Sequence, residues 1–183
     1  MNDRLHTSAP LSAGTRHIPD TQSEQDLRHL AIQRVGVRRL RYPLSIEVGG
    51  DVCPTVAEWT LDVALAAEHK GTHMSRFVAW LESLDRPLDA ASLRSELPAM
   101  LDLLHAQEGH IEARFPFFIR KRAPVSGVAS LLEYRGGWAA QQRDGQLSVW
   151  AEAVVPVKSL CPCSKEISDY GAHNQRSEVS LRL

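Results

Sequence analysis

The sequence predicts an α+β protein in which an antiparallel sheet carries helices on one face. Two runs with an apolar residue at every second position precede the middle of the chain. Two amphipathic helical segments then occupy the middle, and three more strand-like runs follow them. Strands grouped before and after a helical pair, rather than alternating singly with helices, favour an antiparallel sheet.

The first predicted strand covers residues 40–48 and the second covers residues 53–65, with "GGD" turning the chain between them. Both runs have the period of two of a half-buried strand, and we expect them to pair antiparallel. The basic cluster "RVGVRRLRY" before and within the first run is interpreted as a solvated strand face. The residues on the alternating, mostly apolar face are Leu40, Tyr42, Leu44, Ile46 and Val48 in the first strand, and Cys53, Thr55, Ala57, Trp59, Leu61, Val63 and Leu65 in the second.

Two helices are predicted in the middle of the chain. Ser75 is placed to cap the segment "RFVAWLESL", which Pro87 ends. Asp89 can cap a second helical segment, and Pro98 inside that segment is expected to kink or split it. The apolar faces are formed by Phe77, Val78, Leu81 and Leu84 in the first helix, and by Leu93, Leu97, Leu101 and Leu104 in the second.

Strand patterns return after the helices. Alternating runs cover residues 111–119, the segment "VASLLEY" and residues 147–157, with "KRAPVSG" and "RDGQ" as the breaks between them. A last alternating run, "SEVSLRL", places Val179, Leu181 and Leu183 on one face. The apolar row of this run is expected to be exposed and to promote association.

Composition narrows the functional class. The chain has 183 residues with 43% hydrophobic content, enough for one packed core, which we place in residues 31–183, after a flexible arm at residues 1–30. A net charge of −1 argues against broad binding to nucleic acids or anionic membranes, and no apolar run is long enough to span a bilayer. Three cysteines and no signal-peptide core indicate reduced thiols and a cytoplasmic protein.

The stretch "LCPCSKEISDYGAH" is the strongest candidate site. Cys161 and Cys163 are separated by one residue, which is too short a spacing for both sulfurs to bind one tetrahedral metal easily. Ser164 is a reasonable N-cap for the short turn "KEISDY", and Gly171 can supply the left-handed residue that ends it. Because a helix N-terminus lowers the pKa of a nearby thiol, and because one short helix returns the chain, Cys161 and His173 could meet in a site.

Several long blocks, in order, resemble the GTP cyclohydrolases of the IB type, which belong to the tunnelling-fold superfamily. These blocks are "PDTQSEQDLRHLAIQRVGVRRLRYPL", "KGTHMSRFVAWLE", "APVSG" followed by "EYRG", and "PVKSLCPCSKEISDYGAHNQRS". The resemblance covers residues 19–183 and implies a tunnelling fold that assembles into a barrel as a homotetramer, with active sites between subunits. It also implies a hydrolase that opens the imidazole ring of GTP to give 7,8-dihydroneopterin triphosphate and formate, the first step of tetrahydrofolate synthesis.

In that family, a cysteine and a histidine at this spacing bind a catalytic divalent metal, and they correspond to Cys161 and His173. Zinc is the default metal for such a pair, while a carboxylate ligand would leave manganese or iron(II) open. His173 suits the role of metal ligand and equally that of general acid. Family members continue for several more elements that supply a glutamate and a histidine, so we expect a fragment or a site completed by another chain.

Other residues and functions remain as alternatives. Cys163 is interpreted either as a small buried residue or as a redox partner of Cys161. His73 is a weak candidate for substrate binding beside a role at a strand-to-helix corner, and His105 and His110 are expected to be solvated structural residues. A related nitrile reductase acting on a deazaguanine is a rival function, although its motif has an acidic residue where this chain has Ser168. An inactive purine-binding chain is the other rival.

Overall fold

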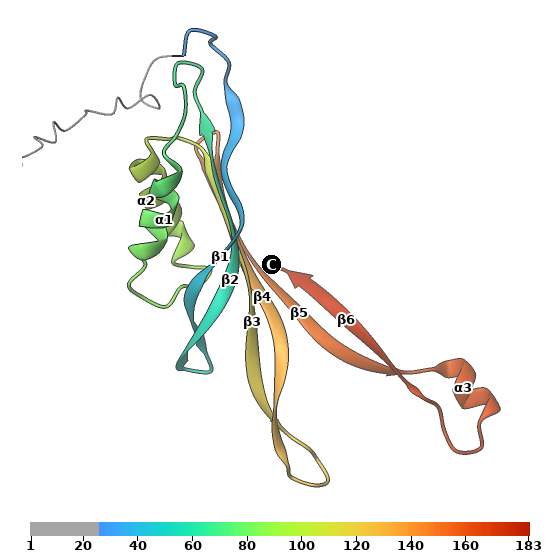
Figure 1. Ribbon diagram of the computed structural model, residues 1–183. Helices are drawn as coiled ribbons and strands as arrows, with labels where there is room; N and C mark the ends of the chain where they lie inside the picture. The colour runs from blue at the N-terminus through green and yellow to red at the C-terminus, as the bar shows by residue number, and fades with distance from the viewer. Residues whose placement is uncertain (1–25) are drawn as a thin grey trace, which may run out of the picture.

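The computed structural model describes residues 26–183 and shows a six-stranded antiparallel sheet with two helices packed against one face (Figure 1). The spatial order of the strands follows the chain, so each strand pairs with the next. The predicted arm falls almost entirely outside the described residues. The elements are β1 (Ile32–Val48), β2 (Asp51–Leu65), α1 (Met74–Glu82), α2 (Leu93–Leu104), β3 (Gly109–Arg122), β4 (Ala129–Arg143), β5 (Gln146–Leu160), α3 (Pro162–Ile167) and β6 (Asn174–Arg182).

The first strand pair forms as predicted, but β1 begins at Ile32 rather than at Leu40. The pairing register shifts between Val37 and Leu40, where Arg39 has a positive φ of 57°. A bulge of this kind inserts a residue and breaks the period of two, which is why the alternation was not visible in the earlier half of the strand. The arginines of "RVGVRRLRY" are exposed, which confirms the solvated strand face.

The two predicted helices are present and lie together on one face of the sheet (Figure 1). The expectation for Ser75 was wrong, because the extended residue before α1 is His73 and Ser75 already lies inside the helix. Ser92 is the N-cap of α2, and the Asp89 carboxylate instead accepts a hydrogen bond from the Ser92 N–H at 2.6 Å. Pro98 does not split α2, because the apolar face of the helix is buried on both sides of the proline, from Leu93 to Leu104, and this packing outweighs the local cost.

The core forms between β2, β3 and the two helices. Trp59 of β2 and Trp80 of α1 meet edge to face, with ring centroids 5.9 Å apart. Alternate residues of β2 are buried, as the period of two predicted. The largest fully buried side chains are Trp59, Trp80, Phe77, Leu61, Leu93, Leu97, Met100, Leu101, Ile111 and Val63.

One end of β4 and β5 contacts α2, whereas their other ends and β6 extend away from the helices. β4 continues to Arg143, far beyond the predicted "VASLLEY", and the turn at residues 144–145 leads directly into β5. β5 and β6 form a hairpin that carries α3 at its outer end (Figure 1). β6 is an edge strand of the described sheet, with Val179 and Leu181 half exposed, as expected from the sequence. No helix within residues 26–183 is long and apolar enough to cross a membrane.

Candidate functional site

Cys161 lies at the junction between β5 and α3. Its backbone is extended and it forms the N-cap of α3, which begins at Pro162. Proline at the first helical position has its φ preset for a helix, so the helix starts there and not after Ser164. The expected N-cap role of Ser164 is therefore wrong. The Cys161 side chain is buried, whereas Cys163 is exposed within α3, which overturns the interpretation of Cys163 as a small buried residue.

Ser164 is the main hydrogen-bond partner of the Cys161 thiol. A hydrogen bond from the Ser164 side chain, another from its backbone N–H, and weaker bonds from Cys163 lower the pKa of Cys161 below its ordinary value, against the opposing effect of burial. Hydrogen bonds to the thiolate stabilise the charged form. The arrangement favours the protonation state that binds metals and attacks electrophiles.

His173 is held beside the same serine. Its backbone carbonyl accepts a hydrogen bond from the Cys161 N–H at 3.2 Å, which closes the loop between β5 and β6. Its ring Nδ1 lies 2.9 Å from Ser164 Oγ. Gly171, with a φ of 99°, takes the left-handed conformation that the sequence predicted for this loop. Cys161, Ser164 and His173 therefore form one cluster, with the histidine Nε2 as its remaining ring nitrogen.

The donor chemistry of this cluster suits a soft divalent metal. A thiolate and an imidazole are the ligands that zinc prefers, and a catalytic zinc has three protein ligands. Within residues 26–183, no group of three His, Cys, Asp or Glu side chains is arranged to hold a metal ion. The donor atoms of Cys161 and His173 thus suit two ligands of a metal, and within residues 26–183 of one chain no third such side chain is grouped with them to complete a site.

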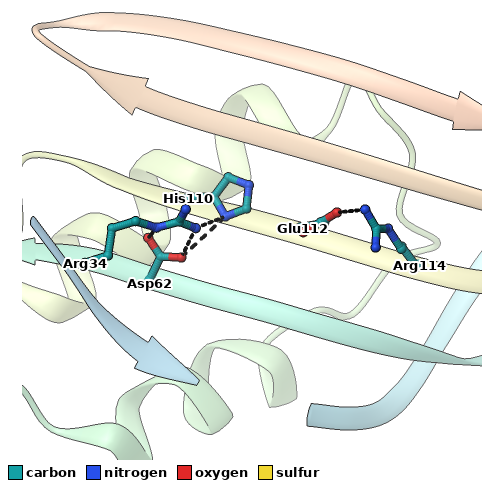
Figure 2. Close-up of polar contacts among 5 residues, drawn as sticks. All are labelled: Arg34, Asp62, His110, Glu112 and Arg114. Carbon is teal, nitrogen blue, oxygen red and sulfur yellow. Dashed lines mark hydrogen bonds and ion pairs between the residues drawn. The ribbon is translucent and has the colours of Figure 1, made fainter. Parts of the chain in front are cut away.

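A second polar cluster lies on β1, β2 and β3 (Figure 2). Arg34 Nε donates to Asp62 Oδ1 at 2.8 Å, and its Nη2 lies 2.5 Å from Oδ2. His110 Nδ1 lies 3.1 Å from Arg34 Nη2 and 3.5 Å from Asp62 Oδ2. Burial raises the pKa of Asp62, but hydrogen bonds from His110 and Arg34 and their charges bring it below its ordinary value. His110 is therefore a half-buried member of an ion-pair network, not the solvated residue that was expected.

This network borders a cavity of about 850 Å³ at one end of the sheet. The walls come from the start of β1, the end of β2, the start of α1, the segment between α2 and β3, and the end of β4. His73 and His105 line the cavity too. His73 lies at the strand-to-helix corner, one of the two positions considered for it from the sequence, and exposed His105 ends α2 with a φ of 54°.

The cavity is lined by the end of β4, next to the start of β5, whereas Cys161 directly follows the end of β5. Figure 1 shows α3, at the end of β5, far from α1 and α2. β5 begins beside the cavity, after Arg143, and reaches Leu160 after 15 residues. At about 3.3 Å per residue, a strand of this length extends for at most about 50 Å. The cluster of Arg34, Asp62 and His110 could not be found from sequence patterns. These patterns place charged residues on the polar faces of the strands, but they do not reveal the pairing register that brings the three residues together.

Comparison with known proteins identifies the family. The model of the family described as type I GTP cyclohydrolase FolE2 matches residues 18–183. A GTP cyclohydrolase FolE2 from Methylibium petroleiphilum is 70% identical over 172 residues, which cover 92% of this chain and 58% of the relative. Relatives with the same description from Paraburkholderia xenovorans and Herminiimonas arsenicoxydans are 54% and 51% identical, over 90% of this chain and 62% and 63% of their own lengths. The chain thus spans about three fifths of the length of these curated relatives. With a match over nearly its whole length, the chain belongs to the type I GTP cyclohydrolase FolE2 family.

Proposed function

We propose that the chain carries part of the active site of a GTP cyclohydrolase. The reaction is the hydrolytic opening of the imidazole ring of GTP, which gives 7,8-dihydroneopterin triphosphate and formate at the start of tetrahydrofolate synthesis. The observation that carries the proposal is the cluster of Cys161, Ser164 and His173 in a chain of this family. The cytoplasmic location expected from the cysteine content remains a prediction.

Cys161 and His173 are proposed to hold the divalent metal. Zinc is the first choice for a thiolate and an imidazole, and manganese or iron(II) would suit a third ligand with a carboxylate. When bound, the metal supplies Lewis acidity that lowers the pKa of water enough for attack on C8 of the purine near neutral pH.

Ser164 is proposed to position both ligands. Its hydroxyl contacts His173 Nδ1 and also bonds the Cys161 sulfur, so it orients the imidazole while favouring the thiolate. His173 Nε2 is left to bind the metal or to protonate the departing ring nitrogen, and one nitrogen cannot do both at once. If His173 acts as the general acid, His173→Gln should leave the metal content unchanged. If His173 is a metal ligand, the same variant should lose metal.

The active enzyme is proposed to be a homotetramer with sites between subunits. Two features support this assembly. The cavity and the Cys161 cluster lie near opposite ends of β5 within one chain, and the apolar residues of the edge strand β6 are half exposed. His73 remains a candidate for contact with GTP, since it lines the cavity. Light scattering on an active preparation checks the assembly, and a stable active monomer would contradict it.

The function can be tested with a chimera that adds the residues of the Methylibium relative lying outside the match. We expect the chimera to bind about one divalent metal per subunit, the number expected for a single catalytic metal site, and to release formate from GTP. Cys161→Ala should abolish both properties, and Cys163→Ala, the matched control, should do less damage. Metal retention with normal product formation in the Cys161 variant would refute the assignment.

The same assays compare metal binding and turnover between the chain of residues 1–183 and the chimera. With only two candidate ligands in the described part, we expect weak metal binding and almost no turnover from residues 1–183 alone, even with added zinc or manganese. Turnover equal to that of the chimera would show that the ligand count is wrong.

A further inference from the structure

The sheet divides into two separate hairpins at one end. β4 pairs with β5 only as far as Arg135 and Val154, although β4 begins at Ala129 and β5 continues to Leu160. Beyond this point β4 pairs only with β3, and β5 pairs only with β6. Figure 1 shows the two hairpins diverging, so that the β3–β4 turn and α3 lie apart in one chain. Neither end therefore covers the other within a single chain.

The hairpin tip, which we define as residues 120–133, presents apolar and basic side chains to water. Every one of its residues is exposed. Val125 is 99% exposed and Val128 is 65% exposed. The turn that carries them is ordered, because the Ala123 N–H donates to the Val128 carbonyl and the Gly127 N–H donates to the Ala123 carbonyl, both at 2.9 Å. The basic residues beside this turn are Arg120, Lys121 and Arg122.

The α3 surface, which we define as residues 162–172, is a second exposed surface with apolar side chains. No residue of α3 is buried. Ile167 is 88% exposed, and Tyr170, in the loop that follows, is fully exposed. Glu166 and Asp169 lie next to these apolar residues in the sequence. Large apolar side chains gathered in water, with charged residues around them, are typical of a surface that a protein partner covers.

The two surfaces are complementary in charge. The hairpin tip has three basic residues and one acidic residue, whereas the α3 surface has two acidic residues and one basic residue. Within residues 26–183, Arg120, Glu166 and Asp169 take part in no ion pair, so their charges remain available to a partner. Opposite charges around an apolar contact steer two proteins together and disfavour wrong partners.

We propose that the hairpin tip of one copy docks on the α3 surface of a second copy, with the apolar side chains at the centre and the opposite charges around them. The contact joins two different surfaces, so it is head to tail and continues from copy to copy around a ring. It brings a neighbouring chain beside Cys161 and His173, which lie on either side of α3 and its loop. The contact rests on the proposed assembly with sites between subunits, and it specifies which surfaces meet there.

Photo-crosslinking tests the contact directly. The photoreactive residue benzoylphenylalanine in place of Val125 should crosslink to residues 162–172 of a second copy, and mass spectrometry of a mixture with isotope-labelled chains shows that the link joins two copies. The same residue in place of Val52, which is 61% exposed at the β1–β2 turn, is the matched control and should give no crosslink to that segment. Crosslinking needs neither metal nor GTP, so the docking can fail while the cyclohydrolase assignment stands.

Mixing two variants tests the head-to-tail geometry. In sedimentation experiments, Val125→Asp and Tyr170→Asp should each weaken self-association by about tenfold or more, the effect of losing a central apolar contact. Val52→Asp should leave it unchanged. Both mutated side chains are almost fully exposed, so the fold is kept. A mixture of the two variants retains one intact contact, between the hairpin tip of the Tyr170 variant and the α3 surface of the Val125 variant, and a dimer should reappear.

Three results would overturn the proposal. They are a crosslink from position 125 to a different segment or none at all, self-association of Val125→Asp equal to that of the wild type, and no recovery of a dimer in the mixture. Binding of the wild-type chain to phosphatidylserine vesicles or to DNA would also overturn it, if Val125→Asp lost that binding and kept its self-association. The hairpin tip would then belong to a different partner.

Discussion

The two partners of the ion pair between Arg34 and Asp62 should differ strongly in how much folding stability is lost when each is mutated. The Arg34 side chain is 61% exposed and the Asp62 side chain only 9% exposed. Removing the arginine leaves a carboxylate that is mostly shielded from water, with His110 as its remaining partner. Removing the aspartate leaves a guanidinium that water can solvate. Arg34→Gln is therefore expected to cost more stability than Asp62→Asn.

The magnitudes follow from burial. Breaking a buried pair by deleting one partner costs about 3–5 kcal/mol. For Arg34→Gln we expect about 2–3 kcal/mol, because His110 and water from the cavity compensate in part. For Asp62→Asn we expect about 1 kcal/mol, because the amide oxygen still accepts a hydrogen bond and Arg34 is exposed. Arg114→Gln, which breaks a more exposed pair with Glu112, is the control and should cost less than about 1 kcal/mol.

The pH dependence gives a second signature of the same pair. The pKa of Asp62 is lower in the folded chain than its ordinary value of 3.8. A lowered carboxyl pKa stabilises the fold at pH values above the unfolded pKa, and this stability is lost as the pH falls through the folded pKa. The stability difference between the wild type and Asp62→Asn should therefore be constant near neutral pH and shrink below about pH 3.8.

Urea unfolding followed by circular dichroism measures these differences over a range of pH. The variants should unfold cooperatively with an unchanged denaturant slope, so that midpoints report stability. A cost for Asp62→Asn equal to or above that for Arg34→Gln would refute the asymmetry. A difference between wild type and Asp62→Asn that does not change in acid would show that the carboxylate charge contributes nothing.

Three further perturbations probe the thiol and the core. Ser164→Ala should raise the pKa of Cys161 towards its ordinary value, because the strongest hydrogen bond to the sulfur is lost. Ultraviolet titration of the thiolate measures this pKa, and an unchanged value would show that Ser164 does not lower it. Trp80→Ala should cost about 3–5 kcal/mol in urea unfolding, since the indole is buried against Trp59, and a loss below about 1 kcal/mol would mean that the core can collapse around the gap. Gly109→Ala should cost about 1–3 kcal/mol, because the added Cβ would lie 2.7 Å from the Asp62 carbonyl oxygen, and unaltered stability would show that β2 can move away.

Much of the candidate site could be predicted from local sequence. Cys161 and His173 lie on either side of one short helix, and a helix followed by a left-handed glycine returns the chain on itself. The position of Ser164 could not be predicted in this way, because the helix begins at Pro162 and this places the serine inside its first turn. From this position the hydroxyl contacts both the thiol and the imidazole.

The alternation of side chains along the strands and the periodic apolar face of the helices determined the element order and the core from sequence alone, since these periods are local properties of the backbone. The bulge near Arg39 and the register that joins Arg34, Asp62 and His110 depended on the tertiary structure. Pairing register arises from contacts between strands far apart in the chain, which no local period encodes. The cavity has the same origin, because its walls come from five segments that only the packed sheet and helices bring together.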